Sequence, residues 1–201
     1  TNIIINMALI NFSNVTKYYV NDLILDHVSF QINKNDRVAL IGNNGVGKTT
    51  LFKLILKIEE PTLVQKEDKV GEISILNGIS IGYLNQNAIE NIENTVFEEL
   101  LSVFKKTIDI EKDLEKISEK INVCHDEDTL NKYDKLLKEY QENRGYTYLN
   151  EIDEMIYRFG FDKEIKEKQI KFLSGGERRK VAFMKILLFK YDLLLLDEPT
   201  N

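Results

Sequence analysis

Cysteine, proline, glycine and long apolar runs are all scarce in this 201-residue sequence. The single cysteine, Cys124, excludes a disulfide within the sequence and a cysteine-only metal cage, which favours a reducing compartment, here the cytoplasm. Two prolines and 10 glycines leave little material for long flexible linkers. No run approaches the ~18 apolar residues of a membrane-spanning helix, so we expect no membrane-spanning segment.

An excess of positive charge is also missing. Lys and Arg number 27 against 33 Asp and Glu, which gives a formal net charge of −6. Because nucleic-acid phosphates attract clustered positive charge, we expect no DNA binding, and any RNA contact must be local. With 43% hydrophobic and 30% charged residues, the composition is typical of a soluble globular domain.

The first part of the sequence has the period-two alternation of β-strands. Residues 10–15 and 23–32 alternate apolar and polar side chains, and Asp26 and His27 interrupt the second run. Residues 37–41, RVALI, form a short apolar run that predicts a buried strand.

Two further strands are predicted at residues 71–75 and 79–84, with Asn77 and Gly78 between them as a hairpin turn. Near the end, residues 193–196 predict another buried strand.

Helical periodicity occurs in four other places. Residues 48–57 place Leu51, Leu54 and Ile55 on one face, and helices are also predicted at about 149–159 and 175–189.

Residues 95–142 contain no Gly or Pro and carry two apolar seams at helical spacing. The seams consist of Ile110, Leu114, Ile117 and Ile121, and of Leu130, Tyr133, Leu137 and Tyr140. A polar, acidic stretch at 122–128 separates them, so we expect two packed helices joined by a turn.

A glycine-rich loop follows the run at 37–41 and matches the pattern G-x-x-x-x-G-K-[ST]. It consists of Gly42, Asn43, Asn44, Gly45, Val46, Gly47, Lys48 and Thr49, and Thr50 comes next. Glycines let the backbone curl so that several N–H groups face a phosphate, and the following helix points its N-terminus at the same anion. Lys48 would reach the β- and γ-phosphates, and the Thr49 hydroxyl would ligate Mg²⁺.

Two acids end the predicted strand at 193–196. Acids at the carboxyl end of a parallel strand face the ligand crevice. Asp197 would therefore hold Mg²⁺, and Glu198 would orient and deprotonate the attacking water. Strands ending in acids are common by themselves; the phosphate loop in the same sequence makes this pair specific.

A third motif, LSGGE, begins at Leu173 and opens the predicted helix at 175–189. Ser174 is a good N-cap, and Gly175 and Gly176 expose backbone N–H groups. On its own, this run would indicate only a capped helix.

These three motifs, in this order, resemble the ATP-binding cassette superfamily, and LSGGE separates the sequence from other P-loop proteins. The resemblance covers residues 8–201. It implies an α/β P-loop fold with a mixed sheet core and a helical subdomain, and it implies ATP and Mg²⁺ as ligands.

The resemblance also assigns residues that the pattern alone does not. Tyr19 matches the aromatic that stacks on adenine, with Tyr18 as the alternative. Gln86 matches the catalytic glutamine that contacts Mg²⁺ and senses the γ-phosphate. Ser174 and Gly176, with Gly175 between them, would cap the γ-phosphate of an ATP held by an opposite cassette. The superfamily's switch histidine has no match, since His27 and His125 both precede the strand at 193–196.

Within the superfamily the sequence looks like the first cassette of an ABC-F protein. The features are the run from Gly82 to Gln86 (GYLNQ), Arg178 and Arg179 directly after LSGGE, and DEPTN at the end. ABC-F proteins carry two cassettes in one chain and a helical arm in the first, and residues 104–145 look like that arm. We therefore expect one cassette domain over residues 8–201, incomplete at its C-terminus, with the arm inserted in its helical subdomain.

The resemblance implies a cytoplasmic ATPase that works with a second cassette of the same parent chain, while the isolated fragment would turn over weakly or not at all. It also implies ribosome binding, in translation regulation or antibiotic resistance. The arm from Lys105 to Glu142 carries 8 Lys and 11 acidic residues, a poor match to RNA in general. The alternatives are the ATPase of a membrane transporter, a DNA-repair cassette and a non-catalytic nucleotide sensor.

Overall fold

The computed structural model describes residues 8–63, 71–84, 89, 91–121 and 126–197. The chain divides into two compact units. The strand-rich unit comprises Thr1–Tyr83 and Tyr191–Asn201, and the helical unit comprises Leu84–Lys190.

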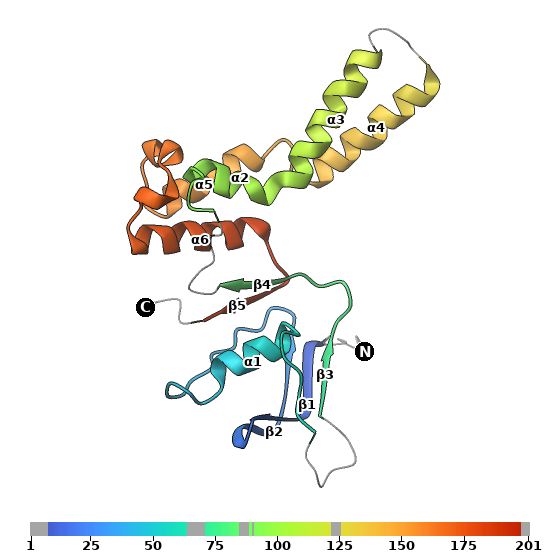
Figure 1. The fold of residues 1–201 in the computed structure, drawn as a ribbon. Helices are drawn as coiled ribbons and strands as arrows, with labels where there is room; N and C mark the ends of the chain where they lie inside the picture. Colours follow the sequence, from blue (N-terminus) through green and yellow to red (C-terminus); the bar gives the residue numbers. More distant parts are fainter. Residues whose placement is uncertain (1–7, 64–70, 85–88, 90, 122–125, 198–201) are drawn as a thin grey trace, which may run out of the picture. The chain divides into compact units, whose positions relative to one another are not determined.

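The strand-rich unit contains a three-stranded antiparallel sheet in the order β2-β1-β3 (Figure 1). Its strands are β1 (Ala8–Tyr19), β2 (Asp22–Asn33) and β3 (Glu72–Ile75). On the central strand β1, Ile10 and Phe12 are buried, and the Phe12 ring stacks on Phe30 at 4.5 Å between centroids. The period-two pattern of the sequence therefore predicted both long strands and the buried face of β1.

The predicted interruption of the second strand is a bulge. His27 has a φ of 49°, which lies in the left-handed region, and the β1–β2 register shifts between Val15 and Lys17. The His27 N–H donates to the buried Thr16 hydroxyl at 3.1 Å, so the irregular turn of the backbone keeps a hydrogen-bond partner.

A second sheet in this unit pairs β4 (Ile81–Leu84) with β5 (Leu193–Leu196). Asp192, just before β5, accepts hydrogen bonds from the N–H and hydroxyl of Ser80, just before β4. At the other ends of the strands, Tyr83 contacts Asp197. The two strands therefore run in the same direction and end side by side.

The hairpin predicted at Asn77 and Gly78 is wrong, although the turn itself is present. Gly78 has a φ of 83°, as a tight turn requires. The strands on its two sides pair elsewhere, β3 with β1 and β4 with β5. Each of these strands pairs with a strand that is distant in the sequence, and a local Asn-Gly pair carries no information about such partners.

The buried strand predicted at residues 37–41 is also wrong. The segment has no regular structure and pairs with no strand in the described part of the chain, and Val38 and Ile41 are 59% and 95% exposed. An apolar run becomes a strand only where a neighbouring edge offers hydrogen bonds.

Helix α1 (Lys48–Ile55) packs its apolar face into the core of the strand-rich unit. Leu51, Leu54 and Ile55 are buried together with Leu195 of β5 and Ile10 of β1, as the sequence predicted for the helix. This packing fixes the start of α1 relative to the end of β5.

The helical unit is built around α2 (Val96–Leu101), α5 (Tyr148–Arg158) and α6 (Gly175–Phe189). The described part of the unit also contains three short 3₁₀ helices, Ser102–Phe104, Lys163–Glu167 and Ile170–Phe172. Its core includes Leu100, Ile152 and Met184, one from each main helix. The helices predicted at 149–159 and 175–189 are thus confirmed.

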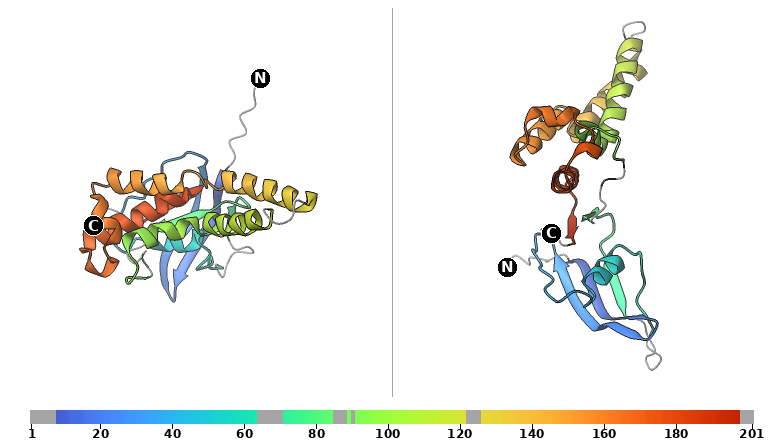
Figure 2. Two further views of the ribbon diagram at one scale, coloured as in Figure 1. Left: turned by 90° about the horizontal axis from the view of Figure 1, so that it is seen from above. Right: turned by 60° about the vertical axis from the view of Figure 1, so that its left-hand side comes forward.

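The predicted helical hairpin consists of α3 (Lys105–Ile121) and α4 (Glu127–Glu142). The helices lie side by side and extend beyond α2, α5 and α6 (Figures 1 and 2). At the base, the hydroxyls of Tyr140 and Tyr148 donate to the two oxygens of Glu111 at 2.9 and 3.0 Å. Burial, and then the Glu111 carboxylate, raises the pKa of Tyr140 to about 12, and burial also raises the pKa of Tyr148. Both phenols at the foot of the hairpin therefore stay protonated at neutral pH.

Within the described residues, no helix combines the length and the apolarity that crossing a membrane would require.

One buried charge in the helical unit generates a stability prediction. The Glu99 side chain is 3% exposed and receives hydrogen bonds from Lys185 Nζ of α6 and from Asn94 Nδ2. Lys185→Met would leave the carboxylate buried without its counter-ion and should lower the free energy of unfolding by about 3 kcal/mol. Chemical denaturation measures the change. Arg179→Met, at an exposed site on the same helix, should change stability by less than about 0.5 kcal/mol, and equal losses for both variants would refute the role of the pair.

Candidate phosphate and metal site

The glycine-rich loop leads directly into α1, and glycine occupies the two positions that need a left-handed backbone. Gly45 and Gly47 have φ values of 86° and 95°. Gly47 is also the N-cap of α1, and among the described residues no side chain caps this end and no acid lies in the first turn. A helix N-terminus of this kind, with its positive dipole end and its amides, suits an anion.

The Lys48 ammonium lies within the curve of this loop. Its Nζ donates to the carbonyl oxygens of Gly42 and Asn43 at 2.8 and 2.9 Å. The loop therefore surrounds a cation at the position that the sequence assigned to the phosphate-binding lysine. Anionic oxygens would attract the same ammonium more strongly than two neutral carbonyls do.

The first residue after β5 reaches the same helix. The Thr49 hydroxyl donates to Asp197 Oδ2 at 3.0 Å, although the two residues are 148 positions apart. The sequence predicted both residues as metal-binding, and the strand-rich unit brings them together.

A third side chain, Tyr83 at the end of β4, joins this pair. Its hydroxyl donates to the same Asp197 Oδ2 at 3.2 Å, and its ring packs edge-on against Phe52 of α1 at 6.1 Å between centroids. Burial, and then the Asp197 charge, raises the pKa of Tyr83, so the phenol remains a donor. In the sequence, Tyr83 stands out only as part of the run from Gly82 to Gln86, because nothing in the local pattern indicates a contact across 114 residues.

The donor set fits a magnesium ion bound together with a phosphate ligand. Mg²⁺ in such sites takes one or two carboxylates and completes its shell with water and substrate oxygens. Thr49 Oγ1 and the Asp197 carboxylate are oxygen ligands of this kind. Among the described residues no group of three or more His, Cys, Asp or Glu side chains is placed to hold a metal.

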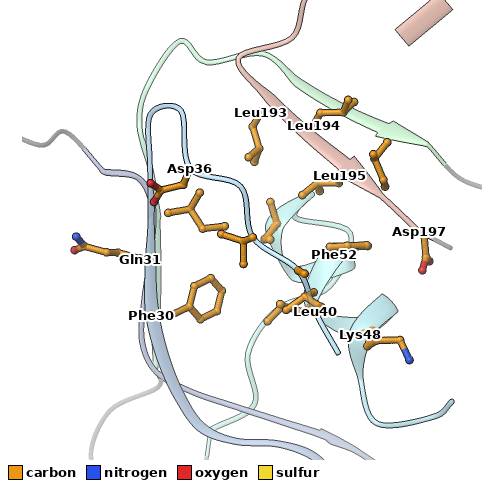
Figure 3. Close-up of a pocket in the computed structure, with 16 residues that line it drawn as sticks. Phe30, Gln31, Asp36, Leu40, Lys48, Phe52, Leu193, Leu194, Leu195 and Asp197 are labelled. Atoms are coloured by element: carbon orange, nitrogen blue, oxygen red, sulfur yellow. The ribbon is translucent and has the colours of Figure 1, made fainter. Parts of the chain in front are cut away.

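A cavity of about 700 Å³ adjoins this site, but its lining is mainly apolar. Figure 3 shows Lys48 and Asp197 on one side of the cavity, with Phe30 and Asp36 on the other. Val38 and Leu40 of the unpaired segment line it together with residues 193–196 of β5. A triphosphate would gain little from such walls, so the polar site is the loop and not this hollow.

The two candidate aromatic residues lie at the end of β1. Tyr19 is partly exposed, and its hydroxyl contacts Glu59. Tyr18 is half-buried, and its N–H donates to the Thr62 hydroxyl at 3.2 Å. The greater exposure of the Tyr19 side chain favours it over Tyr18 for contact with a base.

The LSGGE motif caps α6 in the helical unit, as predicted. The Ser174 hydroxyl accepts the Glu177 N–H at 3.3 Å, and the Glu177 carboxylate accepts the Ser174 N–H at 2.7 Å. Hydrogen bonding to the Glu177 carboxylate, first from the Ser174 backbone N–H and then from the Ser174 side chain, keeps the pKa of Glu177 below its usual value. Added Cβ atoms at Gly175 and Gly176 would meet no described atom within 4 Å, so the space beside these two glycines is open.

Two predicted site residues, Gln86 and Glu198, lie outside the described residues. Their predicted roles as catalytic glutamine and general base remain predictions from the sequence.

Comparison with known sequences decides the family. A sequence profile described as ABC transporter matches residues 25–201. The chain belongs to the ABC transporter family.

The relatives of this cassette include F-type proteins, in agreement with the resemblance. The chain is 33% identical over 198 residues to the putative ATP-binding protein YdiF of Bacillus subtilis (strain 168), covering 97% of the chain and 30% of that protein. It is 31% identical to ABC transporter F family member 5 of Arabidopsis thaliana, covering 96% and 28%. The tylosin resistance ATP-binding protein TlrC of Streptomyces fradiae is 29% identical, with coverage of 96% and 34%. The chain thus spans about a third or less of these relatives' length.

Solved cassettes share the fold at lower identity. A putative ABC transporter ATP-binding protein from Pyrococcus furiosus matches with a TM-score of 0.61 at 21% identity, covering 94% of this chain and 75% of that one. A nucleotide-free ATP-binding cassette from an ABC transporter gives a TM-score of 0.57 at 21% identity, covering 97% and 70%. The mixed α/β cassette fold predicted from the motifs is confirmed.

The contact between Tyr83 and Asp197 generates a prediction about metal binding. Tyr83→Phe removes only the hydroxyl that orients the carboxylate, and losing such a partner of a metal ligand weakens metal affinity by roughly tenfold or more. A titration with Mn²⁺ in the presence of ATP, monitored by electron paramagnetic resonance, should show this loss of Mn²⁺ affinity. The ATP affinity measured without metal should hardly change. Tyr157→Phe, at a tyrosine that is 81% exposed on α5, is the control. Unchanged Mn²⁺ affinity in Tyr83→Phe would refute the orienting role.

Proposed function

We propose that this cassette binds Mg-ATP in its phosphate loop and hydrolyses it when a second cassette completes the site, in a protein that acts on the ribosome. The main support for a nucleotide site is the hydrogen bond between Thr49 and Asp197, which joins the phosphate loop to the acid after β5. Membership of a family of ATP-binding cassettes supports ATP as the nucleotide.

Each side chain of the site has a distinct task in this proposal. The amides of residues 42–49 and the start of α1 bind the phosphates, and Lys48 neutralises charge on the β- and γ-phosphates. Thr49 and Asp197 hold Mg²⁺, which when bound neutralises the phosphate charge that grows during transfer. Glu198 orients the attacking water and accepts its proton, and Gln86 senses the γ-phosphate. Most of the rate enhancement then comes from positioning and charge neutralisation.

A second cassette is needed because the LSGGE turn serves a nucleotide held elsewhere. Ser174 and Gly176 offer an N-cap hydroxyl and an open backbone at the start of α6. In the composite arrangement this turn caps the γ-phosphate of the partner cassette, and the partner's turn caps the phosphate bound here. We therefore expect weak or absent turnover from the 201-residue chain alone.

The ribosomal role is supported by the arm and by the relatives. Two relatives are named as F family members and one as a resistance protein, which favours a protein of this type. The hairpin α3–α4 is a long polar projection whose base is fixed by Glu111 and the two tyrosines. Exposed lysines such as Lys112 and Lys120 on α3 supply local positive charge on an arm whose total is negative.

A catalytic trap tests the proposed function. In the full-length parent, Glu198→Gln together with the matching change in the second cassette should keep ATP binding and abolish hydrolysis. Because the closed pair then persists, the protein should cosediment with ribosomes in the presence of ATP. Adding Lys48→Ala should abolish the trapping by weakening nucleotide binding. Normal ATP turnover by the Glu198→Gln parent would remove Glu198 from the mechanism.

Failure to trap, with ATP still bound, would leave the cassette in place and contradict the ribosomal role. The search would then turn to membrane partners, since a transporter ATPase is the competing function.

The arm generates a separate prediction for the same assay. Replacing residues 112–138 by a short Gly-Ser turn removes most of α3–α4 but retains Glu111, Tyr140 and the ion pair between Lys106 and Glu139. Ribosome cosedimentation of the trapped parent should fall at least about tenfold because the phosphate contacts of the arm are lost, while ATP affinity stays the same. Full cosedimentation without the arm would show that the contact lies elsewhere.

A further inference from the structure

The residue expected to stack on the base is held by a carboxylate that no motif includes. The Tyr19 hydroxyl lies 2.6 and 2.5 Å from the two oxygens of Glu59 and donates a hydrogen bond to that carboxylate. Glu59 lies four residues beyond Ile55, the last residue of α1. The end of β1 is thereby tied to the segment that follows the phosphate-loop helix.

Two lysines converge on the same carboxylate. Lys17 Nζ lies 3.3 Å from Glu59 Oε2, and Lys53 Nζ of α1 lies 3.2 Å from Glu59 Oε1. The side chains of Lys17 and Glu59 are only 13% and 18% exposed, so this is a packed cluster and not a loose surface pair. The Tyr19 hydroxyl first, and then the lysines, keep the pKa of Glu59 below its usual value, and the carboxylate therefore stays an acceptor at neutral pH.

The cluster also determines which face of the Tyr19 ring is accessible. The Lys17 ammonium lies over the ring at 5.4 Å from its centroid, a cation–π contact that covers one face. The Tyr19 side chain is nevertheless 37% exposed. With one face under the ammonium, the opposite face is the one on which a base can stack.

The strand register links the strand that carries Tyr19 to the end of the phosphate loop. A Cβ atom at Gly47 would lie 2.8 Å from Ile24 Cγ2 and 3.3 Å from Leu25 Cδ2, so the end of the loop packs on β2. Leu25 pairs with Lys17 in the β1–β2 ladder, two residues before Tyr19. The β2 residues that pack on the end of the loop therefore lie opposite β1 two residues before Tyr19.

We propose that Glu59 is a positioning residue for nucleotide recognition: it fixes the Tyr19 ring so that the face opposite Lys17 receives the purine base. This role rests on the proposed function, in which the phosphates of that nucleotide occupy the loop. A ring that is already ordered loses little rotamer freedom when the base stacks on it, and affinity is higher by that saved cost.

The test separates base recognition from phosphate recognition. It uses the full-length parent with the phosphate-loop lysine of the second cassette replaced, so that only this site reports. Calorimetry measures the affinity for ATP and for inorganic tripolyphosphate, which has no base. Glu59→Leu should weaken ATP binding roughly two- to tenfold and leave tripolyphosphate binding unchanged, because only the ordering of the ring is lost.

A double-mutant cycle tests whether Glu59 acts through Tyr19. Tyr19→Phe removes the hydroxyl that Glu59 accepts and should weaken ATP binding to the same extent. The double variant should lose no more ATP affinity than either single variant, since both substitutions remove the same hydrogen bond between Tyr19 and Glu59. Glu60→Leu, at the exposed neighbouring acid, is the matched control and should leave both affinities as they are.

Each result that contradicts the prediction points to a different physical cause. Unchanged ATP affinity in Glu59→Leu, or additive losses in the double variant, would overturn the positioning role. An equal loss of tripolyphosphate binding would also overturn it, because Glu59 would then stabilise α1 through Lys53 instead of ordering the ring. If Lys48→Ala weakens neither ligand, the proposed nucleotide site itself fails, and that result is independent of Glu59.

Discussion

The hydrogen bond from the Thr49 hydroxyl to Asp197 is the contact on which the rest of the site depends. It joins the start of α1 to the end of β5 across 148 positions of sequence, and it creates one polar site from two motifs. The apolar core below it, with Leu51 and Leu54 against Leu195, supplies the stability that keeps the two ends in register. Glycines at positions 45 and 47 allow the loop to reach this helix with a left-handed backbone.

Hydroxyl-to-carboxylate hydrogen bonds recur around the site and set the direction of the side chains that would touch the ligand. Tyr83 holds Asp197 in place, and Glu59 holds Tyr19. In both cases the supporting group comes from a different element than the residue it orients. A binding residue needs such a neighbour, because an unsupported side chain must be ordered at the moment of binding.

The sequence predicted most of the local structure but less of the long-range pairing. The strands at 10–15, 23–32 and 193–196, helix α6 to its exact bounds and the arm hairpin follow from periodicity and caps, which are properties of neighbouring residues. The hairpin at Asn77 and Gly78 and the strand at 37–41 were wrong, because strand partners come from elsewhere in the chain. The motifs named Lys48, Thr49 and Asp197 as candidate site residues, and the structure brings Thr49 and Asp197 together. The contacts of Tyr83 and Glu59 were not predictable, since they exist only after folding.

The central claim is that the loop at residues 42–49 and Asp197 form one site for a nucleotide and its metal ion. The most direct measurement is a crystal structure of the full-length parent with a non-hydrolysable ATP analogue and Mn²⁺, whose anomalous scattering locates the ion. We expect phosphates within the loop beside Lys48, and an ion whose coordination sphere includes Thr49 Oγ1 and Asp197. Phosphates in the apolar cavity lined by Phe30 and Leu195, or an ion remote from Thr49 and Asp197, would contradict it.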